Sequence, residues 1–122
     1  MAKKVLLIDD DEDVTFLLAF RLKSNGFEVV VAHVGALGIK KAIEEKPDII
    51  CCDLMIPEID GFAIAQRLND MEETRHIPII LLTGAMNQDI VRKTQNTNIK
   101  DCLAKPFDSI ILIEKIKALT NE

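Results

Sequence analysis

Five side chains that could do ion and phosphate chemistry are spread along this 122-residue sequence. They are two adjacent acids, Asp9 and Asp10, a third acid, Asp53, the hydroxyl of Thr83 and the amine of Lys105. Three carboxylates brought together would repel one another unless a cation neutralised them. Mg²⁺ suits such a set, because it prefers oxygen ligands, binds one or two carboxylates directly and keeps waters that a phosphoryl oxygen can replace. The set predicts a phosphoryl-accepting site with Asp53 as the nucleophile and with Lys105 and Thr83 contacting the phosphoryl oxygens.

The elements that would position these residues are short apolar runs alternating with amphipathic stretches. Near-continuous β-branched runs are typical of parallel strands that are buried on both faces. The predicted strands are Val5–Ile8, Val29–Val31, Ile49–Cys52, Ile79–Leu82 and a weaker Cys102–Ala104. The predicted helices are Val14–Leu22 with Gly26 as its stop, Leu37–Glu45 before Pro47, Phe62–Asn69, a polar Asn87–Gln95, and a fifth from its cap Asp108 to about Leu119. The pattern predicts an α/β fold of five β-α units.

All five strands of such a sheet are parallel, because the crossovers between them are right-handed. Their carboxyl ends then share one edge, where open α/β sheets bind ligands. Asp9 and Asp53 come at the ends of the first and third strands, Thr83 at the end of the fourth, and Lys105 after the fifth. Alone, Asp53 could be a turn former and Lys105 a surface lysine. Their joint placement is what indicates a site.

Other acids in the same region have simpler explanations. Asp11, Glu12 and Asp13 suit the first turn of a helix, where the helix dipole favours negative charge. The spacing of Asp9, Asp11 and Asp13 also imitates the start of an EF-hand loop. That loop would require Gly where Val14 stands and Glu where Phe20 stands, so a calcium loop is excluded.

Composition and charge argue against several classes of function. The net charge is −5, 4% of residues are aromatic, and Trp and Tyr are absent, so we expect no direct nucleic-acid ligand. The apolar run Val5–Ile8 is too short for a signal peptide or a membrane span. Cys51, Cys52 and Cys102 form no C-x-x-C pair, which predicts a reduced, cytoplasmic protein with cysteines in its core. Nothing resembling a linker divides residues 1–122, so we expect a single domain.

The remaining candidate residues give no chemistry. His33 and His76 fit neither a nucleophile nor a metal constellation, and we expect them to be structural or surface residues. The segment Gly35–Gly38 is a helix entry, and neither a G-x-G-x-x-G nor a Walker sequence occurs, which argues against a nucleotide ligand.

Four segments resemble the receiver domain of two-component response regulators, and the likeness covers the whole chain. Val5–Asp10 resembles the acidic opening of that family, and Asp53–Gly61 resembles its phosphoacceptor loop. Ile79–Gly84 and Leu103–Phe107 resemble its threonine and lysine-proline segments. The resemblance implies a flavodoxin-like, doubly wound (βα)5 fold with helices on both faces and the strand order 2-1-3-4-5.

The resemblance also implies roles for the site residues. Asp53 would accept the phosphoryl group from the phosphohistidine of a sensor histidine kinase or a phosphotransfer protein. Mg²⁺ would be held directly by Asp10, Asp53 and the backbone carbonyl of Met55, with Asp9 acting through water. The family is a signalling module rather than a metabolic enzyme, although it assists its own phosphorylation and dephosphorylation.

Two further implications concern the lysine segment and the two residues that flank the phosphoryl group. Lys105 and the Thr83 hydroxyl would hold the phosphoryl oxygens, and the Lys105–Pro106 bond is expected to be cis. Met55 and Ala85 occupy the two variable positions of the family beside the phosphoryl group. Neither side chain can orient an attacking water, so we expect slow autodephosphorylation.

The sequence departs from the family pattern at two positions. Cys102 stands where the family usually has an aromatic residue, so we expect switching to run through Thr83 and the loop Gly84–Met86 instead of a ring rotation. Asn98 stands where the family often has glycine, which predicts a left-handed turn there.

The isoleucine-rich last helix supplies more apolar surface than one buried stripe needs. Two explanations are open. The extra apolar surface could be ordinary core, or one face of the helix, together with the fourth helix and fifth strand, could dock a downstream protein or a second copy of the chain. Beside a stand-alone receiver, three alternatives remain open. They are a receiver excised from a larger DNA-binding or enzymatic response regulator, a flavodoxin-like small-molecule binder and a haloacid-dehalogenase-like phosphatase.

Overall fold

The computed structural model describes residues 2–95 and 97–121. Within these residues the chain alternates strictly between strand and helix. The strands are β1 (Lys4–Ile8), β2 (Glu28–Ala32), β3 (Ile49–Asp53), β4 (Ile79–Thr83) and β5 (Ile99–Ala104). The helices are α1 (Glu12–Ser24), α2 (Gly35–Glu45), α3 (Gly61–Asp70), α4 (Gln88–Lys93) and α5 (Ser109–Thr120).

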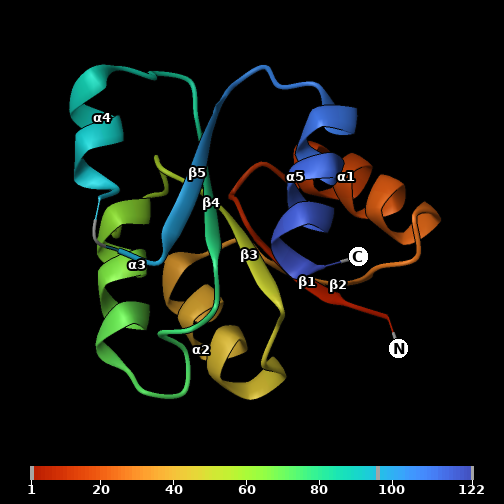
Figure 1. Ribbon diagram of the computed structural model, residues 1–122, viewed down its shortest axis with the longest axis horizontal. Helices are drawn as coiled ribbons and strands as arrows, with labels where there is room; N and C mark the ends of the chain where they lie inside the picture. Colours follow the sequence, from red (N-terminus) through yellow and green to blue (C-terminus); the bar gives the residue numbers. More distant parts are fainter. Residues whose placement is uncertain (1, 96, 122) are drawn as a thin grey trace.

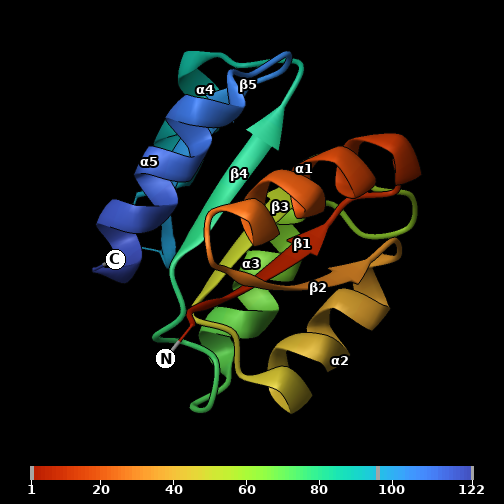
Figure 2. The same cartoon turned by 90° about the vertical axis from the view of Figure 1, so that its right-hand side faces the viewer.

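The five strands form one parallel sheet in the order β2-β1-β3-β4-β5 (Figures 1 and 2). The direction of the chain along the sheet reverses after β2, so β1 and β3 lie side by side with Ile8 paired to Cys52. This is the flavodoxin-like, doubly wound arrangement, and it confirms the predicted fold and strand order. The residues that follow β1 and β3 therefore emerge next to each other.

Helices cover both faces of the sheet, as Figure 1 shows, with α1 and α5 on one side and α2, α3 and α4 on the other. The strand residues divide between the two sides by simple alternation. On β1, Val5 and Leu7 pack with α1 and α5, whereas Leu6 and Ile8 pack with the other three helices. The central strands β3 and β4 are buried along their whole length, which explains their uninterrupted apolar sequence.

Short polar side chains start four of the helices. Asp11, Asp60, Asn87 and Asp108 each accept a hydrogen bond from a backbone N–H in the first turn of the helix that follows. Such caps replace hydrogen bonds that the first turn lacks. They confirm the predicted helix starts at Asp108 and in the acidic run after β1. Gly26, with φ +89°, confirms the predicted stop after α1.

The edge of the sheet departs most from prediction. β5 begins at Ile99, three residues before the predicted Cys102–Ala104, because Ile99 pairs with Ile79 and the register then shifts around the polar Lys100. Polar residues are tolerated there, since β5 has a neighbouring strand on one side only. α4 is shorter than predicted, because Asn87 is its cap and the helix ends at Lys93.

The left-handed turn predicted at Asn98 is wrong. In the described part of the chain, the non-glycine residues with positive φ are Lys46, Glu58 and Asn121. Asn98 is instead 4% exposed at the start of β5, where its carbonyl accepts from the Ile79 N–H. Its side chain is therefore part of the interior.

Two of the three cysteines are core residues, as predicted. Cys51 and Cys52 are buried on β3, and burial raises the pKa of the Cys51 thiol to about 12, so it is not a reactive thiolate at neutral pH. Cys102 is only half-buried, because it lies on the edge strand β5. All three are free thiols.

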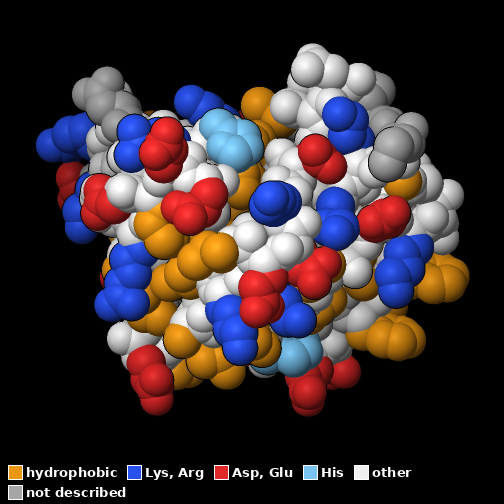
Figure 3. All heavy atoms as spheres, turned by 90° about the horizontal axis from the view of Figure 1, so that it is seen from below, with side chains coloured by type: hydrophobic (Ala, Val, Ile, Leu, Met, Phe, Trp, Pro, Cys, Tyr) orange, Lys and Arg blue, Asp and Glu red, His pale blue; other side chains and the backbone are white. Residues whose placement is uncertain are grey.

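The described surface mixes charges of both signs. On the face shown in Figure 3, acidic and basic side chains are interleaved with hydrophobic ones. This face therefore offers no continuous basic surface of the kind that binds a phosphate backbone. None of the described helices combines the length and apolar character that crossing a membrane requires.

Candidate phosphoacceptor site

The residues predicted to do chemistry come from four strand ends at one edge of the sheet. Asp9 directly follows β1, Asp53 is the last residue of β3, Thr83 is the last of β4 and Lys105 directly follows β5. The backbone continues the sheet at this edge, since the Lys105 N–H donates to the Thr83 carbonyl at 2.7 Å. The parallel order thus places residues that are up to 96 positions apart beside one another.

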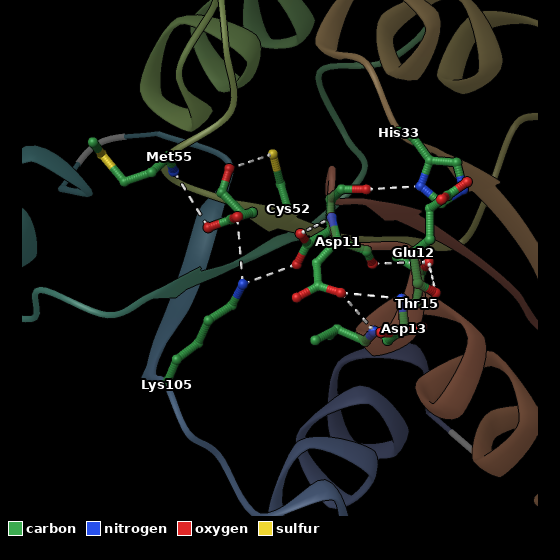
Figure 4. Close-up of polar contacts among 11 residues, drawn as sticks. Asp11, Glu12, Asp13, Thr15, His33, Cys52, Met55 and Lys105 are labelled. Atoms are coloured by element: carbon green, nitrogen blue, oxygen red, sulfur yellow. Dashed lines mark hydrogen bonds and ion pairs between the residues drawn. The ribbon is translucent and has the colours of Figure 1, made fainter.

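Lys105 links the two buried acids of the site (Figure 4). Its Nζ atom lies 2.9 Å from Oδ2 of Asp9 and 3.3 Å from Oδ2 of Asp53. Asp9 is 3% exposed and Asp53 is 7% exposed, whereas a quarter of the Lys105 side chain reaches solvent. The shorter of the two contacts is the one with Asp9.

Backbone donors orient the remaining oxygen of each acid. The N–H of Asp11 donates to Oδ1 of Asp9 at 3.0 Å, and the N–H of Met55 donates to Oδ1 of Asp53 at 3.3 Å. Hydrogen bonds to a charged carboxylate stabilise its ionised form and fix its rotamer. Each buried acid therefore has one oxygen held by the backbone and one on the ammonium.

A glycine allows the loop after β3 to close on the site. An added Cβ at Gly61 would lie 2.9 Å from the Asp53 carbonyl oxygen and 2.9 Å from Cδ2 of Leu81. The Gly61 N–H also donates to the Leu54 carbonyl at 2.9 Å. The start of α3 can thus pack directly on the backbone of the phosphoacceptor candidate only because this residue has no side chain.

The charges of the site perturb one another. Burial and the neighbouring charge of Asp9 raise the pKa of Asp53, although the Lys105 ammonium and the Met55 N–H oppose the rise. Burial lowers the pKa of Lys105, but its hydrogen bond and charge interactions with Asp9 and Asp53 outweigh burial and raise it overall. One ammonium therefore does not fully compensate two buried carboxylates.

A third acid completes a group that could hold a cation. One carboxylate oxygen from each of Asp9, Asp10 and Asp53 lies within 4.8 Å of the other two, and Asp10 is exposed to solvent. An all-oxygen donor set of this kind suits a hard divalent ion, particularly Mg²⁺ or Ca²⁺. The excess negative charge around Asp53 is a second observation in favour of a cation.

Thr83 and Met55 also lie at the site, beside the carboxylates. Thr83 is fully buried, and its Oγ1 accepts from the N–H of Ala85 at 3.1 Å, at the start of the loop to α4. The Met55 side chain is 70% exposed, so only its backbone faces Asp53. The Lys105–Pro106 bond is cis, as the family resemblance implies.

One residue beside the site was missed. His33, which directly follows β2, places Nδ1 3.0 Å from the backbone carbonyl oxygen of Asp9 (Figure 4). The signal that could have found it is the strand register. Because Ile8 pairs with Ala32, the next residues on both strands, Asp9 and His33, must also lie side by side.

The family model of the response regulator receiver domain matches residues 5–117. The chain belongs to the response regulator receiver family. The receiver is 38% identical over 118 residues to the DNA-binding dual master transcriptional regulator RpaA of Synechocystis, a match that covers 95% of this chain and 48% of RpaA. It is 33% identical over 121 residues to the response regulator PleD of Caulobacter vibrioides, covering 99% of this chain and 27% of PleD.

The receiver therefore spans between about a quarter and a half of these relatives. Among solved structures, the receiver domain of sensor histidine kinase PA1611 from Pseudomonas aeruginosa matches with a TM-score of 0.88 and 24% identity, and each chain is covered completely. That structure has a magnesium ion coordinated in its active-site cleft. Family membership makes the receiver a signalling module of two-component systems, and it sets aside the flavin-binder and phosphatase alternatives.

Proposed function

We propose that this receiver accepts a phosphoryl group on Asp53 from the phosphohistidine of a sensor histidine kinase or phosphotransfer protein, in a Mg²⁺-dependent reaction. The observation that carries the proposal is the contact of one lysine with two buried acids, Asp9 and Asp53, beside an exposed third acid. Burying two carboxylates beside a single ammonium costs folding free energy, so packing of the strand ends alone does not explain this arrangement.

The residues present fit a magnesium ion. Asp10, Asp53 and the carbonyl of Met55 would hold it directly, and Asp9 would act through a water molecule. The bound ion would offset the repulsion that raises the pKa of Asp53 and would neutralise charge on the phosphoryl oxygens. The magnesium in the PA1611 receiver domain supports the same choice of ion.

The chemistry of Asp53 is a nucleophilic substitution at phosphorus. A carboxylate oxygen of Asp53 forms the new O–P bond, and the P–N bond of the phosphohistidine breaks with its electron pair going to the imidazole nitrogen. The neutral imidazole is the leaving group, and an acyl phosphate results. Lys105 and the Thr83 hydroxyl would contact the phosphoryl oxygens and stabilise their charge.

A partner can reach this chemistry from the side of α1. An open hollow of about 410 Å³ adjoins the lysine and is lined by Val14, Lys105, Pro106 and Phe107. Its largely apolar walls suit a side chain or helix that approaches the ammonium. We propose that the phosphohistidine donor contacts this hollow while its phosphoryl group enters the acidic site.

Phosphorylation would then alter the surface formed by α4, β5 and α5, where a downstream protein or a second copy docks. Cys102 on β5 cannot act as a rotating ring, so the signal would travel through Thr83 and the loop Gly84–Met86. Met86 packs on the same core cluster as Ile90 of α4, which provides a physical connection. We propose that residues 1–122 act as one cytoplasmic receiver domain that binds neither nucleic acid nor membrane itself.

The direct experiment treats the pure protein with a small acyl phosphate, with and without Mg²⁺, and follows intact mass. We expect a gain of one phosphoryl group that requires the metal and is lost in Asp53→Asn. The control is Asp60→Asn, which removes a carboxylate that caps α3 outside the cation cluster. Labelling that persists in Asp53→Asn, or that is independent of Mg²⁺, would refute the proposal.

A further inference from the structure

The peptide group between Asp9 and Asp10 joins two acids of the site. Ala32 at the end of β2 and the following His33 form hydrogen bonds with the backbone of Asp9. The Asp9 N–H donates to the Ala32 carbonyl oxygen at 3.1 Å, one residue beyond the end of β1. The Asp9 carbonyl oxygen lies 3.0 Å from Nδ1 of His33. Two consecutive residues of one neighbouring segment thus hold both backbone polar groups of Asp9.

The nature of the partner fixes the direction of the His33 hydrogen bond. A carbonyl oxygen only accepts, so Nδ1 carries the proton and donates. The carbonyl of Asp9 and the amide of Asp10 form one planar unit. A donor that holds this carbonyl therefore also holds the plane from which the Asp10 side chain departs.

We propose that His33 is a positioning residue for magnesium binding, because it holds the Asp9–Asp10 peptide in the orientation that presents both carboxylates to the cation. The inference rests on the proposed function, since it concerns the ion of that same site. His33 acts through the backbone and contacts no phosphoryl group. Groups that orient metal ligands typically change metal affinity about tenfold or more when they are removed.

The surroundings of His33 allow the idea to be tested by substitution. The half-buried ring borders a hollow of about 360 Å³ between α1 and β2, which Glu12, Phe16 and Lys23 also line. Figure 4 shows Glu12 and His33 on the same side of α1. Because the ring is next to open space instead of inside either core cluster, a smaller side chain can replace it without leaving a sealed cavity.

Two variants separate the hydrogen bond from packing. In His33→Asn, the amide nitrogen stands as many bonds from Cβ as Nδ1 does, so the donor is kept. His33→Leu keeps a branched side chain of similar size and removes the donor. His76→Leu is the matched control, because His76 is exposed before β4 at the opposite end of the sheet.

The measurement is a Mg²⁺ titration of each purified protein, followed through the backbone amide signals of the site residues. We expect His33→Leu to weaken Mg²⁺ binding about tenfold, and His33→Asn and His76→Leu to remain within about twofold of wild type. The Asp10 amide signal of the metal-free protein should move in His33→Leu and return toward wild type in His33→Asn.

Two results would overturn the inference. One is unchanged Mg²⁺ affinity in His33→Leu, and the other is equal weakening in His33→Leu and His33→Asn, which would indicate lost packing. If the wild-type protein itself bound no Mg²⁺, the proposed function would fail together with this inference. Tight wild-type binding with either of the first two results would overturn the role of His33 alone.

Discussion

Lys105 and Asp9 form the shorter of the two ion pairs at the acidic edge of the sheet, at 2.9 Å against 3.3 Å for Lys105 and Asp53. The lysine is thus anchored mainly on the acid that is not the phosphoacceptor candidate. Asp53 keeps a raised pKa in spite of this lysine. The arrangement leaves Asp53 able to change partners without releasing Lys105 from the site.

Removing the lysine should destabilise the metal-free protein. In Lys105→Met, Asp9 and Asp53 lose the cation they share, and we expect a loss of about 1–2 kcal/mol, less than for a fully enclosed pair because Lys105 reaches solvent. Mg²⁺ should restore part of the loss. Urea unfolding at neutral pH with and without Mg²⁺ measures both effects.

Lys115→Met is the matched control for that variant. Lys115 pairs with Asp101 at 2.6 Å, but a third of each side chain is exposed, so its loss should cost at most about 1 kcal/mol and should not respond to Mg²⁺. Equal losses in the two variants would contradict a special role for the charge of Lys105.

Asp53→Asn should stabilise the metal-free receiver, and the gain should grow with pH. Because the folded-state pKa of Asp53 is raised, folding favours the protonated carboxyl group. The contribution of Asp53 to stability is therefore fully present below its unfolded-state pKa of 3.8 and is lost as the pH rises through its folded-state pKa. We expect a gain in favour of Asn at about pH 7 and almost none at about pH 3. Thermal unfolding across that range tests the sign; a gain that shrinks as the pH rises would contradict it.

The acidic edge was predictable because it depends on topology more than on packing. Once the runs ending at Ile8, Cys52 and Leu82 are taken as parallel strands, Asp9, Asp53 and Thr83 must share an edge. His33 was missed because its role depends on which residue of β2 faces β1. That register is a tertiary property, and the sequence around His33 carries no local mark of it.

The error at Asn98 has a similar origin. Its residue type favours a left-handed turn, but the pairing of β5 with β4 draws the backbone into an extended ladder and buries the side chain. The early start of β5 escaped prediction for the same reason, since Lys100 and Asp101 are acceptable only because the strand lies at an edge.

Gly84→Ala should separate phosphorylation from its structural response. An added Cβ would have no atom within 4 Å, so the fold accepts it, and the reduced freedom of the unfolded chain should add about 0.4–1 kcal/mol of stability. Phosphorylation of Asp53 should be retained, whereas the loop Gly84–Met86 should follow Thr83 less readily. We expect smaller amide shift changes in α4 on phosphorylation; unchanged shifts would show that the signal bypasses this loop.

The phosphorylated form should be long-lived, and Met55→Asn should shorten its life. The exposed Met55 thioether and the Ala85 methyl group cannot position a water for attack on phosphorus. An amide at position 55 could supply one hydrogen bond to that water, which corresponds to an acceleration of up to about tenfold. The decay of the phosphoryl mass after donor removal measures it. A wild-type half-life of seconds would contradict the expectation of a persistent mark.

Two substitutions of Asn98 distinguish the backbone conformation in the structure from the left-handed turn that its residue type predicts. Within the described residues, neither its amide nitrogen nor its amide oxygen has a hydrogen-bond partner, although the side chain is buried. Asn98→Leu, which has nearly the same shape, should therefore stabilise the fold by about 1 kcal/mol. Asn98→Gly should destabilise it by about 1 kcal/mol, because φ is not positive there and glycine adds freedom to the unfolded chain. If the left-handed turn were correct, the order of the two variants in chemical denaturation would be reversed.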